Sequence, residues 1–95
     1  MTKAEIVDQI ENKTGVDKMA IKASVDAFMD CIKESMIKGE NIYLRGFGTF
    51  VLVPRAMKVG RIISKNLPIE IPAHVIPKFK PSKEFTAQVK KKRTV

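Results

Sequence analysis

The first apolar residues of the chain follow the spacing of a helix. Ile6 and Ile10 lie four residues apart, behind the sequence Thr2-Lys3-Ala4-Glu5, which is typical of a capping box. Gly15 follows as a helix stop, because glycine readily adopts the left-handed conformation that ends helices. The pattern predicts a first helix over residues 3–13.

A longer apolar stripe predicts a second helix over residues 18–38. Asp17 can cap its first turn, and Gly39 closes it. The two helices are predicted to form a hairpin that turns its charged side chains to water. The stripe keeps helical spacing throughout, and its members are Ile21, Val25, Phe28, Met29, Ile32 and Met36.

Beyond the second helix the apolar period becomes that of a strand. Residues 42–45 alternate apolar and polar side chains, and Gly46-Phe47-Gly48 is typical of a turn. Residues 49–53 are β-branched or apolar, which predicts a second strand. A third strand is predicted over residues 74–79, where the chain returns to the sheet.

Between these strands, residues 54–72 read PRAMKVGRIISKNLPIEIP, with basic residues and three prolines. A two-stranded ribbon tolerates proline because both of its strands are edges. Ser64-Lys65-Asn66 suits a turn at the tip. Each limb of about nine residues would reach roughly 30 Å at ~3.3 Å per residue, so the ribbon is predicted to project as an arm.

A last short helix is predicted over residues 83–91, capped by Ser82, with a frayed basic tail from Lys90 to Arg93. The order of elements predicts an α+β fold. It combines a helical hairpin, a three-stranded antiparallel sheet with a long β-ribbon arm, and a short C-terminal helix. Residues 1–95 are expected to form one domain, with residues 1–39 as its helical part.

The net charge of +8 is unevenly distributed along the chain. Residues 1–39 hold six lysines against seven acidic residues, a net charge of −1. Residues 40–95 hold twelve basic residues against three acidic ones, a net charge of +9. A basic excess confined to one part of the chain indicates a polyanionic partner for that part. A generally well-solvated basic surface is the alternative.

The chemistry-bearing residues favour binding over catalysis. Cys31, beside Phe28, Met29 and Ile32, is expected to be a buried helix position and has no second cysteine to pair with. His74 near the base of the arm is interpreted as a surface or structural residue. With one cysteine and one histidine, no metal cluster can be built from these two residue types, so no metal, cofactor or enzymatic activity is expected.

No apolar run approaches the ~18 residues of a membrane span, and the N-terminal residues lack an apolar signal core. The sequence therefore predicts a cytoplasmic protein without a membrane partner.

With these elements in place, the sequence resembles the bacterial HU/IHF histone-like protein family over nearly its whole length. The strongest part of the resemblance is Gly46-Phe47-Gly48-Thr49-Phe50, followed by Arg55, Gly60 and Arg61. Supporting segments are Thr2-Lys3-Ala4-Glu5-Ile6, Lys38-Gly39-Glu40, Ile69-Glu70-Ile71-Pro72-Ala73 and Pro77-Lys78-Phe79-Lys80-Pro81.

The resemblance implies a dimer whose helices interlock beneath a saddle of strands, with two arms that embrace double-stranded DNA through its minor groove. It implies a homodimer, or a heterodimer with a paralogue, associated with the nucleoid. Residues 1–39 would then dimerise and residues 40–95 would bind DNA, with residues 54–72 as the arm. The expected dimer core is aromatic and includes Phe28, Phe47, Phe50 and Phe79.

Apart from the apolar Ile63, the residues of the expected DNA surface either carry a positive charge or are glycines. Arginine and lysine neutralise phosphates, and glycine lets backbone amides approach them. Alternation puts Arg55 and Arg61 on one face of the limb and Lys58 on the other, so twist or a bulge near Gly60 is expected to reconcile them. The candidates are Lys3, Arg45, Gly46, Gly48, Arg55, Lys58, Arg61, Ile63, Lys65, Lys80 and Lys83.

One position departs from the family pattern. The family usually carries a proline at the arm tip, which wedges between base pairs, whereas this chain has Ile63 there, preceded by Ile62. Isoleucine can also unstack a base step, so Ile63 is hypothesised to be the wedge. Strand-forming filler or a protein contact is the alternative.

Three functions remain open on the sequence. The first is a DNA-bending protein with low sequence specificity, whose binding is mostly electrostatic. The second is a site-preferring bending factor that reads DNA shape. The third is a basic structural protein whose arm binds protein or RNA.

Overall fold

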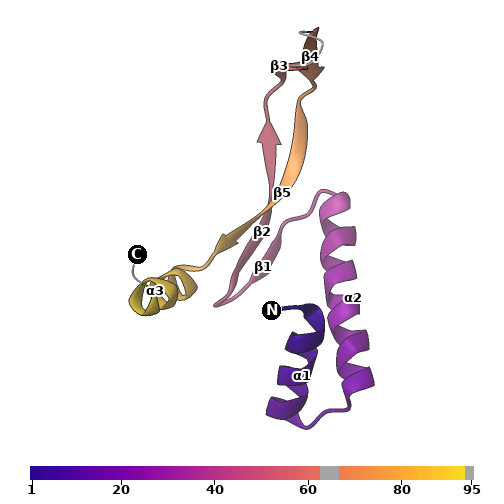
Figure 1. Ribbon diagram of the computed structural model, residues 1–95, viewed down its shortest axis with the longest axis vertical. Coiled ribbons are helices and arrows are strands. Elements are labelled where there is room, and N and C mark those ends of the chain that lie inside the picture. Colours follow the sequence, from indigo (N-terminus) through magenta and orange to yellow (C-terminus); the bar gives the residue numbers. More distant parts are fainter. Residues whose placement is uncertain (63–66, 94–95) are drawn as a thin grey trace.

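The computed structural model describes residues 1–62 and 67–93, and for residues 58–62 and 67–70 this description covers the backbone. The elements form the predicted α+β fold (Figure 1). In chain order they are α1 (Lys3–Thr14), α2 (Lys18–Ile37), β1 (Ile42–Leu44), β2 (Gly48–Arg55), β3 (Lys58–Ile62), β4 (Leu67–Ile71), β5 (His74–Pro81) and α3 (Lys83–Lys92).

Both helices of the hairpin begin and end where the sequence predicts, to within a residue. Thr2 Oγ1 accepts a hydrogen bond from Glu5 N at 3.4 Å, and Asp17 Oδ2 accepts one from Ala20 N at 3.3 Å. Gly15 ends α1 in the left-handed region, with a φ of 72°. These caps satisfy backbone groups that the helix termini would otherwise leave without partners.

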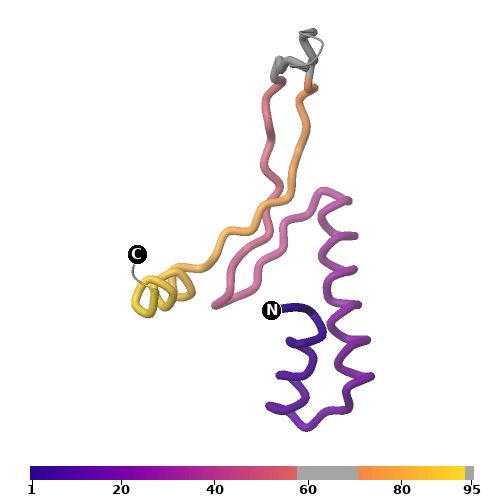
Figure 2. Tube along the Cα trace, viewed as in Figure 1, coloured from indigo at the N-terminus to yellow at the C-terminus, as the bar shows by residue number. Residues whose placement is uncertain are grey.

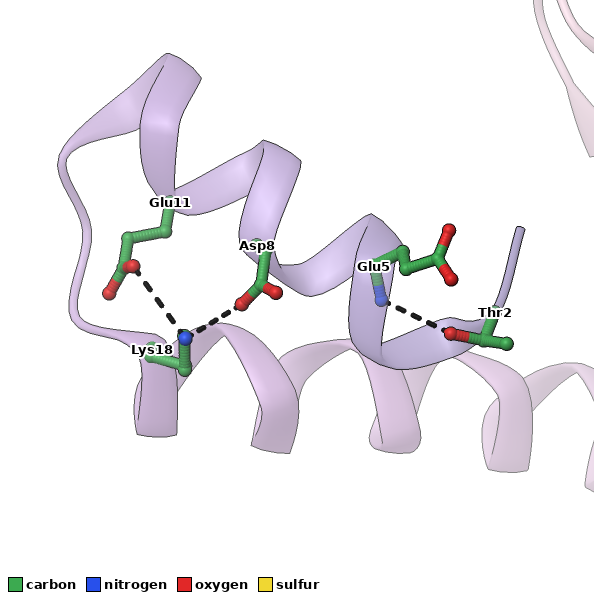
Figure 3. A network of polar contacts seen from close by, with 5 residues as sticks. All are labelled: Thr2, Glu5, Asp8, Glu11 and Lys18. Carbon is green, nitrogen blue, oxygen red and sulfur yellow. Dashed lines mark hydrogen bonds and ion pairs between the residues drawn. The ribbon is translucent and has the colours of Figure 1, made fainter.

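An ion pair also joins the two helices (Figure 3). Lys18 Nζ lies 2.7 Å from Asp8 Oδ1 and 3.9 Å from Glu11 Oε1. The hydrogen bond to Asp8 and the negative charges of Asp8 and Glu11 raise the pKa of Lys18 above its ordinary value of 10.5. All three side chains remain well exposed, so water screens this contact and its effect on stability is small.

The sheet has the order β1-β2-β5 and is antiparallel throughout. Ile42 lies opposite Phe50, and Phe50 lies opposite Phe79, so one row of apolar residues crosses all three strands. Asn41 Oδ1 accepts a hydrogen bond from Leu52 N at 3.1 Å and extends the pairing beyond the end of β1. β2 is longer than predicted at both ends and β5 at its C-terminal end, because the two strands pair from Gly48 and Pro81 beside the turn to Arg55 and His74 at the base of the arm.

The arm continues the register of the sheet into the ribbon β3–β4. Arg55 lies opposite His74, and Lys58, three residues on, lies opposite Ile71, three residues back. The pairing is interrupted between these two positions, where Pro72 has no N–H to donate.

Of the two expected alternatives near Gly60, twist or a bulge, the strand register excludes the bulge. Gly60 lies opposite Ile69 in an unbroken register, and a bulge would need an extra residue on one strand. The interruption of the ribbon falls instead next to Pro72, where the sequence removes a backbone donor.

The last helix begins at its predicted cap but ends later than expected. Ser82 Oγ accepts a hydrogen bond from Phe85 N at 3.1 Å. Lys90, Lys91 and Lys92 form the last turn of α3, so the expectation of a frayed tail from Lys90 is wrong for these three residues. Positive side chains at a helix C-terminus interact favourably with the helix dipole, which supports this turn.

The core of the single chain is very small. Val7, Ile21 and Met36 are the buried apolar residues among those whose burial is described. Cys31 is exposed, which corrects the expectation of a buried position. Its neighbours Phe28 and Met29 are exposed as well, because the apolar stripe of α2 is wider than the face that α1 covers.

The shape of the chain is extended rather than compact. The radius of gyration is 18.9 Å and the principal extents are 57 × 34 × 30 Å, whereas a compact domain of this length has a radius of about 13 Å. Figure 1 shows the arm projecting away from the helices, as predicted. The trace in Figure 2 shows α3 and the helical hairpin as separate bodies joined through the sheet.

Candidate nucleic-acid interface

The sheet has an apolar inner face and a basic outer face. Successive strand residues point to opposite faces, so the residues of the inner groove identify the two sides. A groove of about 760 Å³ lies between the C-terminal half of α2 and the sheet, and its lining includes Ile32, Met36, Phe50, Leu52, Val75 and Pro77.

The outer face carries the alternate positions of the same strands. Lys78 and Lys80 follow one another along β5 and are exposed, and Arg55 and His74 lie opposite each other at the arm end. No acidic residue occupies an outer position of β1, β2 or β5, so this face attracts anions. Its positions are Tyr43, Thr49, Val51, Val53, Arg55, His74, Ile76, Lys78 and Lys80.

A serine fixes the turn between β1 and β2 to the start of α3. Ser82 Oγ donates a hydrogen bond to Gly46 O at 3.1 Å, and Ser82 N donates one to Phe47 O at 2.9 Å. The same hydroxyl caps α3, so the helix N-terminus is held beside the turn. Two segments that lie far apart in the sequence thereby form one rim of the outer face.

The two glycines of the turn are required for different reasons. Gly46 has a φ of 80°, a conformation that side-chain-bearing residues rarely adopt. Gly48 is buried, and a Cβ on it would lie 2.6 Å from Lys80 O and 2.6 Å from the Phe79 ring. Gly46 therefore shapes the turn, and Gly48 lets β5 approach β2 closely.

Four of the predicted DNA-contacting residues line one open concavity of about 490 Å³ at this end of the outer face. They are Arg45, Gly46, Gly48 and Lys80. Anions that enter it would meet two cationic side chains and the backbone of the turn.

Sequence reasoning missed several residues of this surface. Tyr43, which is 75% exposed, lies opposite Thr49, and Thr49 lies opposite Lys80, so the three form one row across the sheet. Lys78 could have been found by counting two residues back from Lys80 along the strand. Tyr43 could not, because its place depends on the register of β1 against β2.

Two predicted lysines stand at helix N-termini. Lys3 begins α1 and Lys83 begins α3, and both are exposed. Lys3 Nζ lies 2.9 Å from Asp26 Oδ1, so a phosphate would have to compete with this carboxylate for the ammonium group.

The remaining candidates belong to the arm. Arg55 is exposed at the end of β2. Lys58 and Arg61 are backbone positions of β3, with Arg61 opposite Pro68. Ile63 and Lys65 lie outside the described residues.

The aromatic candidates cluster where the sheet meets α3. The ring centroids of Phe47 and Phe79 are 5.1 Å apart, and those of Phe50 and Phe79 are 5.0 Å apart. Phe85 of α3, which sequence reasoning placed in the helix but not in this cluster, stacks on Phe47 at 5.5 Å. Phe28 lies on α2 and is 50% exposed in the single chain.

In the described parts of the chain, no three or more histidine, cysteine, aspartate or glutamate residues are grouped so that they could hold a metal ion. No described helix is both long enough and apolar enough to cross a membrane.

Comparison with known proteins identifies the family. The sequence profile of the family described as bacterial DNA-binding protein matches residues 1–90. The chain belongs to the bacterial DNA-binding protein family. A member of this family, the DNA-binding protein HU of Thermus thermophilus, is 40% identical over 91 residues, which cover 96% of this chain and 94% of that protein. The DNA-binding protein HU of Thermotoga maritima is 37% identical over 90 residues, which cover 95% of this chain and all of that protein.

The solved structures agree with this assignment. An Anabaena HU–DNA cocrystal structure matches with a TM-score of 0.89 and 35% sequence identity, covering 94% of this chain and 97% of that one. The structure of HU from Thermotoga maritima matches with a TM-score of 0.66 and 28% identity, covering 94% of this chain and 98% of that one. The fold of the bacterial DNA-binding protein family therefore extends over the described part of this chain.

Proposed function

We propose that two copies of this chain form a dimer that binds and bends double-stranded DNA through the minor groove, largely without sequence specificity. The observation that carries this proposal is the outer sheet face, which is basic from the turn at Gly46 to the base of the arm. The relatives of this chain support the proposal, since they are named DNA-binding proteins and one has been crystallised with DNA. The activity is binding, without catalysis, and the protein would work at the nucleoid.

The exposed apolar surface supports dimerisation. One chain exposes 8315 Å², whereas a compact protein of its mass exposes about 5500 Å². Part of the excess is the arm, and part is apolar surface on α2 and beside the sheet, such as Phe28 and Met29. A second copy would cover this surface, so residues 1–39 and the aromatic cluster are proposed as the dimer core. A homodimer suffices for this, and a paralogue with the same surface could replace one copy.

The rim beside the turn is proposed to hold DNA backbone. Lys80 and Arg45 would neutralise phosphates, and the amides of the turn and of the α3 N-terminus would donate hydrogen bonds to them. Lys83 stands at the same helix terminus, and Lys3 would contribute once it leaves Asp26.

The arm is proposed to enter the minor groove. Arg55, Lys58, Arg61 and Lys65 supply positive charge along it, and arginine favours the narrow, electronegative groove. Ile63 is proposed as the apolar wedge that unstacks a base step and bends the duplex.

Removing charge from the arm tests the binding proposal. We expect the double variant R55A/R61A to bind a short labelled duplex at least tenfold more weakly, because each lost phosphate contact is worth about 1 kcal/mol or more. The matched control is K13A/K22A, which removes the same charge from exposed helix positions away from the outer face. Equal losses in the two variants would argue against a site on the arm.

Competition experiments separate the alternatives. Shuffled DNA that competes as well as any chosen duplex would support low specificity, whereas a preferred sequence would indicate readout of DNA shape. Competition by RNA at equal concentration would extend the binding to RNA. Undiminished binding by R55A/R61A would favour an arm that contacts protein.

A further inference from the structure

The single histidine of the chain stands at the base of the arm, on the outer face. His74 is exposed and lies directly opposite Arg55 in the register of β2 and β5. The Cβ atoms of directly opposed residues are about 5 Å apart, so both side chains can reach one anion. Its neighbour Val75 lines the inner groove, which places His74 on the opposite side of the sheet.

A backbone carbonyl fixes which ring nitrogen of His74 carries hydrogen. His74 Nδ1 lies 2.9 Å from Pro72 O. A carbonyl oxygen only accepts hydrogen bonds, so Nδ1 must be the donor and bear the proton. The neutral ring then has a bare lone pair at Nε2, which a phosphate oxygen would not approach. Protonation of Nε2 turns that atom into a donor without disturbing the bond to Pro72.

We propose that His74, protonated at Nε2, donates a hydrogen bond to a DNA phosphate beside Arg55, and that DNA binding is therefore coupled to proton uptake by His74. This inference rests on the proposed DNA-binding function and adds a proton-linked contact to it. DNA binds the protonated ring preferentially, so affinity rises as the pH falls through the range in which histidine gains its charge, about pH 8 to 5.

The charges around His74 are compatible with this contact. Arg55 faces it from β2, and Lys78 lies beyond Ile76 on the same face of β5. Glu70 lies four residues earlier, in β4, where the backbone is separated from His74 by the unpaired Pro72 and Ala73. A phosphate that sits between Arg55 and His74 is thus approached by two cations when the ring is protonated.

The test is a titration of a short labelled duplex at several values from about pH 5.5 to about pH 7.5, at constant ionic strength. The unaltered chain is compared with H74Q and H74K. We expect the unaltered protein to bind about fivefold or more tightly at the acidic end, the gain of one charged hydrogen bond per chain. H74Q should bind with an affinity that no longer varies with pH, because its amide gains no charge, and H74K with the tighter affinity at every pH. Calorimetry in two buffers of different ionisation enthalpy should report net proton uptake by the unaltered protein and less by H74Q.

Two results would overturn the inference. One is an affinity that does not vary with pH, and the other is H74Q that keeps the pH dependence of the unaltered protein. Binding that tightens as the pH rises would also contradict it, since it would indicate that the bare Nε2 accepts a hydrogen bond from a base. Absence of DNA binding at every pH would instead refute the proposed function itself.

Discussion

The carboxylate of Glu84 faces the turn that we propose as a DNA contact. Its Oε2 lies 3.7 Å from the point where a Cβ would stand on Gly46. A negative charge there opposes an approaching phosphate by about 1 kcal/mol at high dielectric. Glu84→Gln should therefore tighten binding of a short duplex about three- to fivefold at low salt, measured by fluorescence anisotropy.

Glu40→Gln is the matched control for this prediction. Glu40 is exposed between α2 and β1 and makes the same change of charge away from the turn. If both variants tighten binding equally, the effect comes from net charge, and Glu84 has no local role.

We expect substitution of Gly48 to destabilise the protein. A Cβ would lie 2.6 Å from the backbone oxygen of Lys80, which cannot move without shifting β5. Gly48→Ala should lower the free energy of unfolding by about 1–3 kcal/mol, the usual cost of overpacking. Chemical denaturation measures this, and Thr49→Ala, at a half-buried position of the outer face, should cost clearly less. An unchanged midpoint for Gly48→Ala would contradict the close approach of the strands.

For single residues, the sequence shows which side chains are charged more readily than where they lie in the fold. Lys80 was predicted because it precedes the last helix at a position that resembles a DNA-contacting position of the family, and Arg45 only as a basic residue of the expected DNA surface; the concavity brings the two together. Tyr43 and Thr49 were missed because only the strand register aligns them with Lys80. The bond between His74 and Pro72 depends on a backbone conformation that no sequence pattern reveals.

Among the elements, α3 depends on a single hydroxyl for its position. Ser82 Oγ both caps the helix and donates to Gly46 O. Ser82→Ala should lower the free energy of unfolding by about 1–2 kcal/mol, and should weaken DNA binding because the rim loses its alignment. Ser24→Ala is the control, since Ser24 Oγ donates only within α2, to Ala20 O at 2.9 Å. Equal effects of the two variants would refute the proposed role of Ser82.

The arm carries the prediction about bending. Ile63→Ser should leave affinity nearly unchanged but reduce the bend, because serine cannot hold a base step unstacked. Energy transfer between dyes on the two DNA ends measures the bend directly. A bend equal to that of the unaltered protein would exclude Ile63 as the wedge.

Elements with strong local signals were predicted most accurately. Capping residues at Thr2, Asp17 and Ser82 determined where the three helices begin. β2 and β5 were predicted too short, because their ends depend on pairing between distant residues such as Gly48 with Pro81 and Arg55 with His74. The ribbon was predicted from its prolines and charges. The interruption of its strand pairing at Pro72 could be located only from the register of the strands.

At the scale of the whole molecule, the small core predicts that folding requires a partner. Among the residues whose burial is described, three apolar ones are buried, which is too few to stabilise a chain of this size alone. Thermal unfolding should therefore shift to higher temperature as protein concentration rises, because dimerisation is coupled to folding. Light scattering should give twice the 10.7 kDa mass of one chain. A melting temperature independent of concentration, with a monomer mass, would contradict this expectation.

Exposure of Cys31 and Phe28 illustrates why the core was misjudged from the sequence. An apolar stripe at helical spacing predicts burial, but part of the stripe of α2 is exposed in the single chain, because spacing does not indicate whether the same chain or a second one covers it. In the proposed dimer, the second copy would cover Phe28.

The most direct test of the central claim is the salt dependence of binding to a short duplex, measured with the mass of the complex. We expect two chains to bind per duplex, and we expect the affinity to fall at least a hundredfold between about 50 and about 200 mM salt, because phosphate contacts release counterions. The steep dependence should become shallower when Lys78 and Lys80 on the outer face are both replaced by alanine. An affinity nearly constant over that range would contradict binding through phosphate contacts, and one chain bound per duplex would contradict binding as a dimer.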